Sequence, residues 1–267
     1  MTPRRVVTRS LWDGRRSFGG FAAYIVLLVA AIVSIYPSLG HNPALTKLVQ
    51  SYPGTLKAFI GFGGVVDYTS GIGYLGIELF SLMLPALLTA AAVAAGSRAI
   101  AGEEEQQTLD LLLANPISRR RLVLEKAAAL VALLVLLSVV TFGSLAASTA
   151  LAGVDVTLAH LAAATTQTAL FALLYGAIAL AVGAATGRHS LATGVAAGAA
   201  VAAYLANALG ALVGSLKPLR EASPFYQYSV VDPLRHGLVL VHTAPLVAGV
   251  VALIVVAVVT FDRRDLD

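Results

Sequence analysis

Six stretches of the chain are apolar for about the length that a helix needs to cross a lipid bilayer. The hydrocarbon core is roughly 30 Å thick, and a helix needs about 20 mostly apolar residues to span it. These stretches cover residues 18–39, 72–95, 122–151, 158–186, 191–214 and 238–261. Backbone polar groups in lipid must be bonded within the spanning structure, and no alternating barrel pattern occurs. The sequence therefore predicts an all-α integral membrane fold with six transmembrane helices.

The composition agrees with a single transmembrane domain over residues 1–267. Hydrophobic residues make up 58% of the chain and charged residues 12%, whereas a soluble domain has about 25% charged residues. The chain contains no cysteine. This excludes a disulfide framework, a thiolate metal site and a cysteine nucleophile.

The distribution of lysine and arginine predicts the orientation, because cytoplasmic loops carry an excess of them. One side of the predicted bundle receives 13 of the 18 basic residues, namely Arg4, Arg5, Arg9, Arg15, Arg16, Arg98, Arg119, Arg120, Arg121, Lys126, Arg188, Arg263 and Arg264. The other side receives 5, namely Lys47, Lys57, Lys217, Arg220 and Arg235. We predict a multi-pass protein of the cell (plasma) membrane with both termini in the cytoplasm. The pI near 9.5 follows from this asymmetry, and we predict no nucleic-acid partner.

Residues 1–17 have the pattern of an amphipathic helix. At about 100° per residue, the arginines share one face of the helix. The residues that would contact the lipid headgroups are Arg4, Arg5, Arg9, Trp12, Arg15 and Arg16. We predict an interfacial elbow helix with membrane lipids as partners. A plain positive flank, or the n-region of a signal peptide, is the alternative.

Residues 98–118 are the one long polar interruption with a dense, ordered set of charges. Three acids come first, then a leucine-rich turn, then a proline and three arginines. We predict that Gly102 precedes a helix whose first turn holds the acids, where the helix dipole favours them. Pro116 cannot continue that helix. Ser118 is then placed to cap the third span by accepting a hydrogen bond from an orphan amide.

This segment has two interpretations. It is either a solvated loop whose charges only set the topology, or a docking surface for a cytoplasmic partner. The arginines serve topology in both cases, but acids have little effect on orientation. We therefore predict a docking surface built from the acids and the adjacent leucines. Its residues are Glu103, Glu104, Glu105, Thr108, Leu109, Leu112, Leu113, Pro116, Ser118 and Arg119.

The fifth predicted span carries two small-residue motifs, Gly194 to Gly198 and Gly210 to Gly214. Glycines four residues apart let two helix backbones approach closely. The motifs indicate a tight helix contact, either within the chain or between two copies of it.

A few polar residues lie inside the spans, and such residues are functional candidates in a membrane. Glu78 is placed either at the interface or in the lining of a cavity. Gln167 and Asn207 either bond to a neighbouring helix or line a substrate pathway.

Residues 215–237 form an outside segment rich in proline and aromatic residues, which predicts short re-entrant or interfacial helices. The chain has no G-x-x-x-x-G-K-[ST] phosphate loop and no short paired histidine spacing for a metal. We predict no catalytic residue, no metal and no cofactor in this chain.

The run from Glu103 to Lys126 resembles the cytoplasmic segment of ABC-2 type transporter permeases. Members of that family show an acid-rich stretch, a Thr-Leu and a Leu-Leu pair, Pro-x-Ser-Arg and a basic entry to the third span. The matching positions are Glu103 to Glu105, Thr108, Leu109, Leu112, Leu113, Pro116, Ser118, Arg119 and Lys126. The predicted elbow, six spans and outside segment agree with the family in topology.

The resemblance implies the transmembrane subunit of an ATP-driven ABC exporter with a type V exporter-like architecture. It also implies a second copy or a paralogous permease, and separate ATP-binding (ATPase) subunits that carry the ATP and Mg²⁺. In the family, residues corresponding to 103–113 serve as a coupling helix seated on the ATPase.

Two other classes of protein remain open from the residues. A non-transporting membrane scaffold or sensor would use the 98–121 segment to recruit a soluble protein. A secondary carrier would depend on an ion gradient, but no acid–arginine relay crosses the spans.

Overall fold

The computed structural model describes residues 15–39, 43–53, 70–107 and 118–264. Two groups of predicted site residues lie outside these ranges. They are the elbow residues Arg4, Arg5, Arg9 and Trp12, and the coupling residues Thr108, Leu109, Leu112, Leu113 and Pro116.

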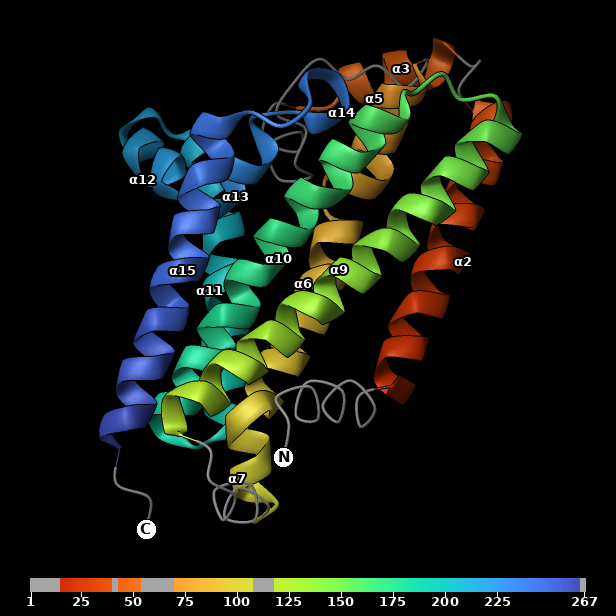
Figure 1. Ribbon diagram of the computed structural model, residues 1–267. Helices are drawn as coiled ribbons and strands as arrows, with labels where there is room; N and C mark the ends of the chain where they lie inside the picture. The colour runs from red at the N-terminus through yellow and green to blue at the C-terminus, as the bar shows by residue number, and fades with distance from the viewer. Residues whose placement is uncertain (1–14, 40–42, 54–69, 108–117, 265–267) are drawn as a thin grey trace.

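Six long helices make up the bundle (Figure 1). The second runs over Gly71–Glu105 as the consecutive elements α5 (Gly71–Leu75), η1 (Gly76–Phe80), α6 (Met83–Ser97), η2 (Arg98–Gly102) and α7 (Glu103–Glu105). The others are α2 (Arg15–Leu39), α9 (Arg119–Ala152), α10 (Leu158–Thr186), α11 (His189–Leu212) and α15 (Leu240–Arg263). All six are long and apolar enough to cross a membrane, and the described residues contain no strand. The all-α prediction with six spans is confirmed.

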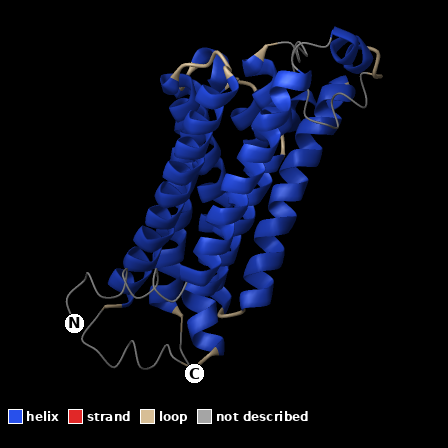
Figure 2. Cartoon of the chain, turned by 90° about the vertical axis from the view of Figure 1, so that its right-hand side faces the viewer, coloured by secondary structure: helices blue, strands red, loops and turns tan. Residues whose placement is uncertain are grey.

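Short helices gather at one end of the bundle, which we call the α13 end. They are α3 (Pro43–Gln50), η3 (Gly214–Leu216), α12 (Lys217–Ala222), α13 (Pro224–Ser229) and α14 (Pro233–His236). The opposite end, which we call the α7 end, holds the start of α2 and the finish of α15 (Figures 1 and 2). A proline is the first residue of α13 and α14 and the second residue of α12, where the missing N–H removes no helical hydrogen bond.

Arg15 and Arg16 belong to the first turn of α2, which continues into the first span. The last residues of the elbow predicted over residues 1–17 therefore belong to the helix of the first span and not to a separate helix. Two arginines at the end of a span are compatible with a helical backbone, because their side chains can reach headgroup level from it.

The fourth span, α10, lies at the centre of the bundle and contacts α6, α9, α11 and α15. In α10, 67% of the most apolar stretch is buried, against 17% in the first span. The helices α6 and α10 cross where Gly96 meets the backbone of Gly176. Neither glycine belongs to the predicted small-residue motifs. The sequence signal was the run of small residues from Ala91 to Gly96.

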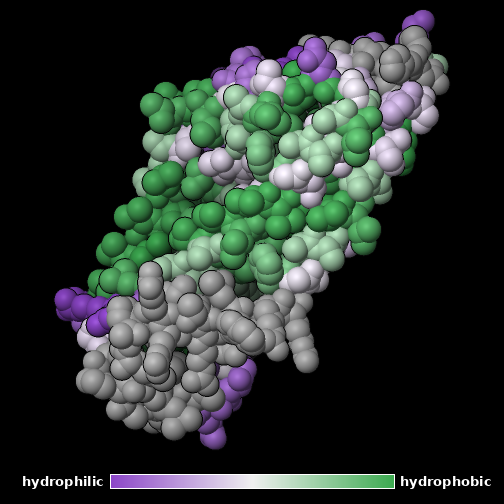
Figure 3. Space-filling model, turned by 45° about the vertical axis from the view of Figure 1, so that its right-hand side comes forward, coloured by the Kyte–Doolittle hydropathy of each residue, from purple (hydrophilic) through white to green (hydrophobic). Residues whose placement is uncertain are grey.

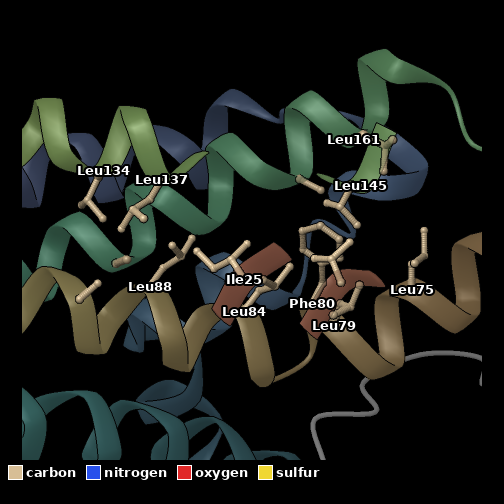
Figure 4. Packing of buried hydrophobic residues seen from close by; sticks show 14 of the residues in the cluster. Ile25, Leu75, Leu79, Phe80, Leu84, Leu88, Leu134, Leu137, Leu145 and Leu161 are labelled. Carbon is tan, nitrogen blue, oxygen red and sulfur yellow. The ribbon is translucent and has the colours of Figure 1, made fainter. Parts of the chain in front are cut away.

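Leucine and other large apolar side chains fill the space between α2, the second-span helix, α9 and α10 (Figure 4). Leu79, Leu84 and Ile25 are wholly buried there, and Leu137 of α9 packs in the same cluster. The outer surface is also apolar, and Figure 3 shows a continuous hydrophobic band between two more hydrophilic ends. An apolar surface around helices of this length and composition is what a bilayer requires.

The second-span helix is interrupted at Ser81 and Leu82, where Leu82 has φ −146°. Pro85 follows and has no N–H to donate to the preceding turn. At this break the carbonyl of Phe80 accepts a hydrogen bond of 2.6 Å from the hydroxyl of Tyr228 in α13. The same hydroxyl lies 3.3 Å from Thr168 Oγ1 of α10. Burial, and to a smaller extent the charge of Asp232, raises the pKa of the Tyr228 phenol, so it keeps its proton.

We expect Tyr228→Phe to destabilise the protein by about 1–3 kcal/mol, because it leaves the buried Phe80 carbonyl without its donor. Thermal unfolding of the purified protein in detergent measures this. Tyr175→Phe is the matched control, because the Tyr175 hydroxyl is buried and has no hydrogen-bond partner among the described residues. Equal unfolding temperatures for the two variants would contradict the assignment of the Tyr228 bond.

Candidate functional site

Three consecutive carboxylates at the tip of the second-span helix bond to three different elements. Glu103 Oε1 accepts a hydrogen bond of 2.8 Å from Lys126 Nζ of α9. Glu104 forms a two-bond ion pair with Arg264, directly after α15, and its Nη1–Oε2 distance is 2.9 Å. Glu105 Oε1 accepts a hydrogen bond of 3.0 Å from the backbone N–H of His189, the first residue of α11. We call these three acids and their three partners the carboxylate joint.

The acids stand at the last turn of a long helix and do not begin a new one. Gly102 has φ −68° and ψ −34°, which are ordinary helical values, so the backbone continues through it. The predicted helix start at Gly102 is therefore wrong. The negative end of the helix dipole disfavours carboxylates at this position. The two cations and the amide of the carboxylate joint offset that cost.

Lys126 is a nearly buried cation, with 5% of its side chain exposed. Its neighbours in α9, Leu122 and Val123, belong to an apolar cluster that also contains Phe261 of α15. A buried ammonium group is stable only when it is paired and hydrogen-bonded. Glu103 supplies this pairing, and the ion pair therefore fixes the tip of the second span against α9.

Gly187 lies directly beside the Glu104–Arg264 pair. It ends α10 with φ +67° and ψ 7°, a left-handed conformation that favours glycine. A Cβ atom on Gly187 would overlap Arg264 and would lie 2.5 Å from both carboxylate oxygens of Glu104. The short link between α10 and α11 thus needs a glycine for the backbone and for the ion pair.

A second set of contacts joins α9 to the C-terminal end of α15. Both Nε and Nη2 of Arg120 donate to Asp262 Oδ2, at 3.1 and 2.9 Å. Arg119 Nη1 donates to the backbone carbonyl of Arg264 at 2.5 Å. Ser118 Oγ accepts from the Arg121 N–H at 3.4 Å, so Ser118 caps α9 as predicted.

The model of the family described as ABC-2 family transporter protein matches residues 21–266. The chain belongs to this family. As an ABC-2 permease it is the membrane component of a transporter and is not itself the catalyst, since ATP hydrolysis lies in a separate subunit. It is a multi-pass membrane protein. No curated protein matches the chain.

The geometry adds contacts within the chain that the docking prediction for this ABC-2 permease did not include. We expected the acids to be presented to a partner, but each carboxylate is bonded to another part of the same chain. The reason is that the ends of α9, α11 and α15 bring a cation or an amide within reach. A contact of these acids with an ATPase stays a prediction, and so does the role of Arg119, whose guanidinium bonds to Arg264.

The four glycines of the small-residue motifs have different surroundings in the permease. Apart from its chain neighbours and the adjacent backbone of α11 itself, a Cβ atom at Gly194 or Gly198 would have no atom of the described chain within 4 Å. At Gly210 it would overlap Arg220 of α12 and lie 2.9 Å from the Leu216 carbonyl oxygen. Gly214 begins η3 and is open. Intrachain packing therefore accounts for Gly210 and leaves the surface around Gly194 and Gly198 open.

The predicted pathway residues lie in different parts of the permease. Gln167 is fully buried. Its Oε1 accepts a hydrogen bond of 3.0 Å from Thr243 Oγ1 of α15, and its Nε2 donates one of 3.4 Å to the Gln227 carbonyl. Asn207 Oδ1 accepts a hydrogen bond of 3.4 Å from Arg220 Nε. Glu78 lies half-buried in η1, toward the α13 end. The side-chain amides of Gln167 and Asn207 thus bond to neighbouring elements, which was one of the two predicted alternatives; the other was the lining of a substrate pathway. A pathway role for any of the three stays a prediction.

From the sequence, Arg264 was used only as an orientation signal, and no role was predicted for Gly187 or His189. Their proximity to Glu104 and Glu105 could not be read from spacing. The one signal in the sequence was position, since the short link between the predicted fourth and fifth spans and the charged residues after the last span fall on the same predicted side of the membrane as the acids. Among the described residues no group of three or more His, Cys, Asp or Glu side chains could hold a metal ion.

Proposed function

We propose that this chain is the permease subunit of an ATP-driven ABC exporter in the cell membrane. In this proposal the α7 end and both termini face the cytoplasm. Two copies, or one copy and a paralogous permease, enclose the substrate pathway. Separate ATP-binding subunits bind the 98–118 segment as a coupling segment and supply the energy by hydrolysing ATP.

The observation that carries the proposal is the continuity of the second-span helix into the coupling segment. After the break at Ser81 and Leu82, the helices α6, η2 and α7 follow one another without a gap over residues 83–105 and carry the second span past the other spans at the α7 end (Figure 1). Residues 106–118 then return the chain to α9. A partner that moves this segment pulls on the end of a transmembrane helix, which is the arrangement that mechanical coupling requires.

The basic residues support the proposed orientation. Arginines at the α7 end include Arg98, Arg188 and Arg263, all exposed at the ends of different spans. Positive side chains at one end of a bundle favour the cytoplasmic face.

The open face of α11 supports a second permease copy. Gly194 and Gly198 are exposed, as are Val195 and Val201 on the same helix. Small residues that let backbones approach are useful only against another helix, because in lipid alone they add no packing. A copy of this chain offers the same small-residue surface, and such a contact is self-complementary.

The test uses the leucines of the coupling segment, because charge reversal of the acids would break bonds inside the permease. We expect Leu112→Asp with Leu113→Asp to lower co-purification of the ATP-binding subunit at least about tenfold, which corresponds to about 1.4 kcal/mol of binding. The purified complex should hydrolyse ATP. Leu48→Asp is the control, since Leu48 is exposed in α3 at the α13 end and should leave the yield unchanged.

Two results would overturn the proposal. One is an undiminished yield of ATPase on the double variant. The other is a bound partner without ATP hydrolysis, which would favour the membrane scaffold or sensor.

A further inference from the structure

We propose that the carboxylate joint transmits movement of the coupling segment to the third, fifth and sixth spans together. The inference rests on the proposed function and names the residues through which it would act. The members of the joint are the side chains of Glu103, Glu104, Glu105, Lys126 and Arg264 and the backbone N–H of His189.

The geometry of a helix explains why three adjacent residues reach three neighbours. Consecutive side chains leave an α-helix about 100° apart, so three in a row point in three directions around the axis. Glu103 reaches α9, Glu104 reaches the end of α15, and Glu105 reaches the start of α11. The tip of the second span therefore sits between three other spans and is bonded to each.

The backbone of α7 makes no comparable connection. Within the described chain, α7 packs extensively only on η2, which precedes it. The helix η2 in turn packs mainly on α10. Packing thus ties η2 mainly to the fourth span, and its buried Ile100 shares an apolar cluster with residues of α9 and α15. The three carboxylates of α7 add polar bonds from the tip of the second span to the third, fifth and sixth spans.

The joint differs from an ordinary surface ion pair in its burial. The side chains of Glu104 and Arg264 are 29% and 21% exposed, and Lys126 is exposed by 5%. At the α13 end, Lys217 and Glu221 form a pair with 70% and 52% exposure and a separation of 3.7 Å. Exposed pairs of that kind contribute little and are screened by salt. The pairs of the joint are short and partly shielded, so they can hold the spans in register while the segment moves.

Glu104 and Arg264 provide the first measurement, which needs no ATPase. Glu104→Arg and Arg264→Glu should each lower the unfolding temperature in detergent, and the double exchange should recover most of the loss. Such a double-mutant cycle isolates the interaction between the two side chains. Additive losses in the double variant would show that the pair contributes no coupling and would overturn the joint.

The second measurement tests transmission in the complex with the ATP-binding subunit. The chain has no cysteine, so Leu240→Cys places a single fluorescent label at the α13 end of the sixth span, where Leu240 is 80% exposed. The readout is the fluorescence change on adding ATP with Mg²⁺, normalised to the ATPase bound. We expect Glu104→Gln to remove more than half of this change and the Glu104→Arg/Arg264→Glu exchange to restore it.

Glu221→Gln removes the exposed Lys217–Glu221 pair at the α13 end and should leave the ATP-dependent fluorescence change unaltered. A Glu104→Gln response equal to that of the parent chain would overturn the joint and leave the exporter proposal intact. Absence of any co-purifying ATPase would overturn the proposed function, and transmission through the joint with it.

Discussion

Gly96→Ala is expected to lower the stability of the permease by about 3 kcal/mol. Adding buried methyl groups to a packed core costs about 1–3 kcal/mol. At Gly96 the new Cβ would collide with the backbone carbonyl oxygen of Gly176 and lie 3.2 Å from Ala179 Cβ. A carbonyl cannot rotate away as a side chain can, so α6 and α10 must separate along their contact. The unfolding temperature in detergent should fall by roughly 5–10 °C.

Alanine substitutions at two further glycines serve as comparisons for the stability loss expected of Gly96→Ala. Gly176→Ala should have a smaller effect, because its Cβ would lie 3.1 Å from atoms of Ala92 and Leu130, which a small shift relieves. Gly143 is exposed in α9, and a Cβ there meets no atom within 4 Å. Gly143→Ala should be neutral or stabilising by up to about 1 kcal/mol, from helix propensity alone. Any other order of the three unfolding temperatures would contradict the α6–α10 crossing.

Gly187→Ala is expected to have the next largest effect, because it disturbs both the backbone and the carboxylate joint. The left-handed conformation costs a residue with a Cβ about 1–2 kcal/mol. The same Cβ would displace Arg264 and Glu104 from each other. The atoms that this Cβ meets are the mobile ends of two partly exposed side chains, so we expect the pair to shift rather than break and to add up to about 1 kcal/mol.

Gly153→Ala separates the two contributions. Gly153 ends α9 with φ +66°, almost the same backbone as Gly187, but a Cβ there meets nothing within 4 Å. The difference between the two unfolding free energies therefore reports the ion pair alone. In a Glu104→Gln background that difference should shrink, because the charge pair is already lost. If Gly187→Ala and Gly153→Ala lower the stability equally, the Glu104–Arg264 pair does not contribute.

Two uses of charge at the α7 end follow from these contacts. Basic residues such as Arg188 and Arg263 are exposed at the ends of the spans, which agrees with the cytoplasmic orientation that we propose for this end. The acids instead hold span ends together. Under the proposed function, a partner that binds the α7 end would act on span ends that are already connected to one another.

The sequence by itself determined the fold class and the family. Six apolar runs of bilayer length require six helices wherever they are placed, because backbone groups in lipid must bond within their own segment. The Ser118 cap was predictable too, since a capping hydrogen bond spans three residues. These features depend on neighbours in the chain.

Only the tertiary structure decided what the acids contact and which glycines pack. The partners of Glu103, Glu104 and Glu105 lie 23, 160 and 84 residues away. Gly194 and Gly198 carry the recognisable motif and are open, whereas the α6–α10 crossing uses Gly96 and Gly176, which lie on two helices. Spacing along one helix shows which residues share a face. The neighbour that meets that face is set by how all six helices pack.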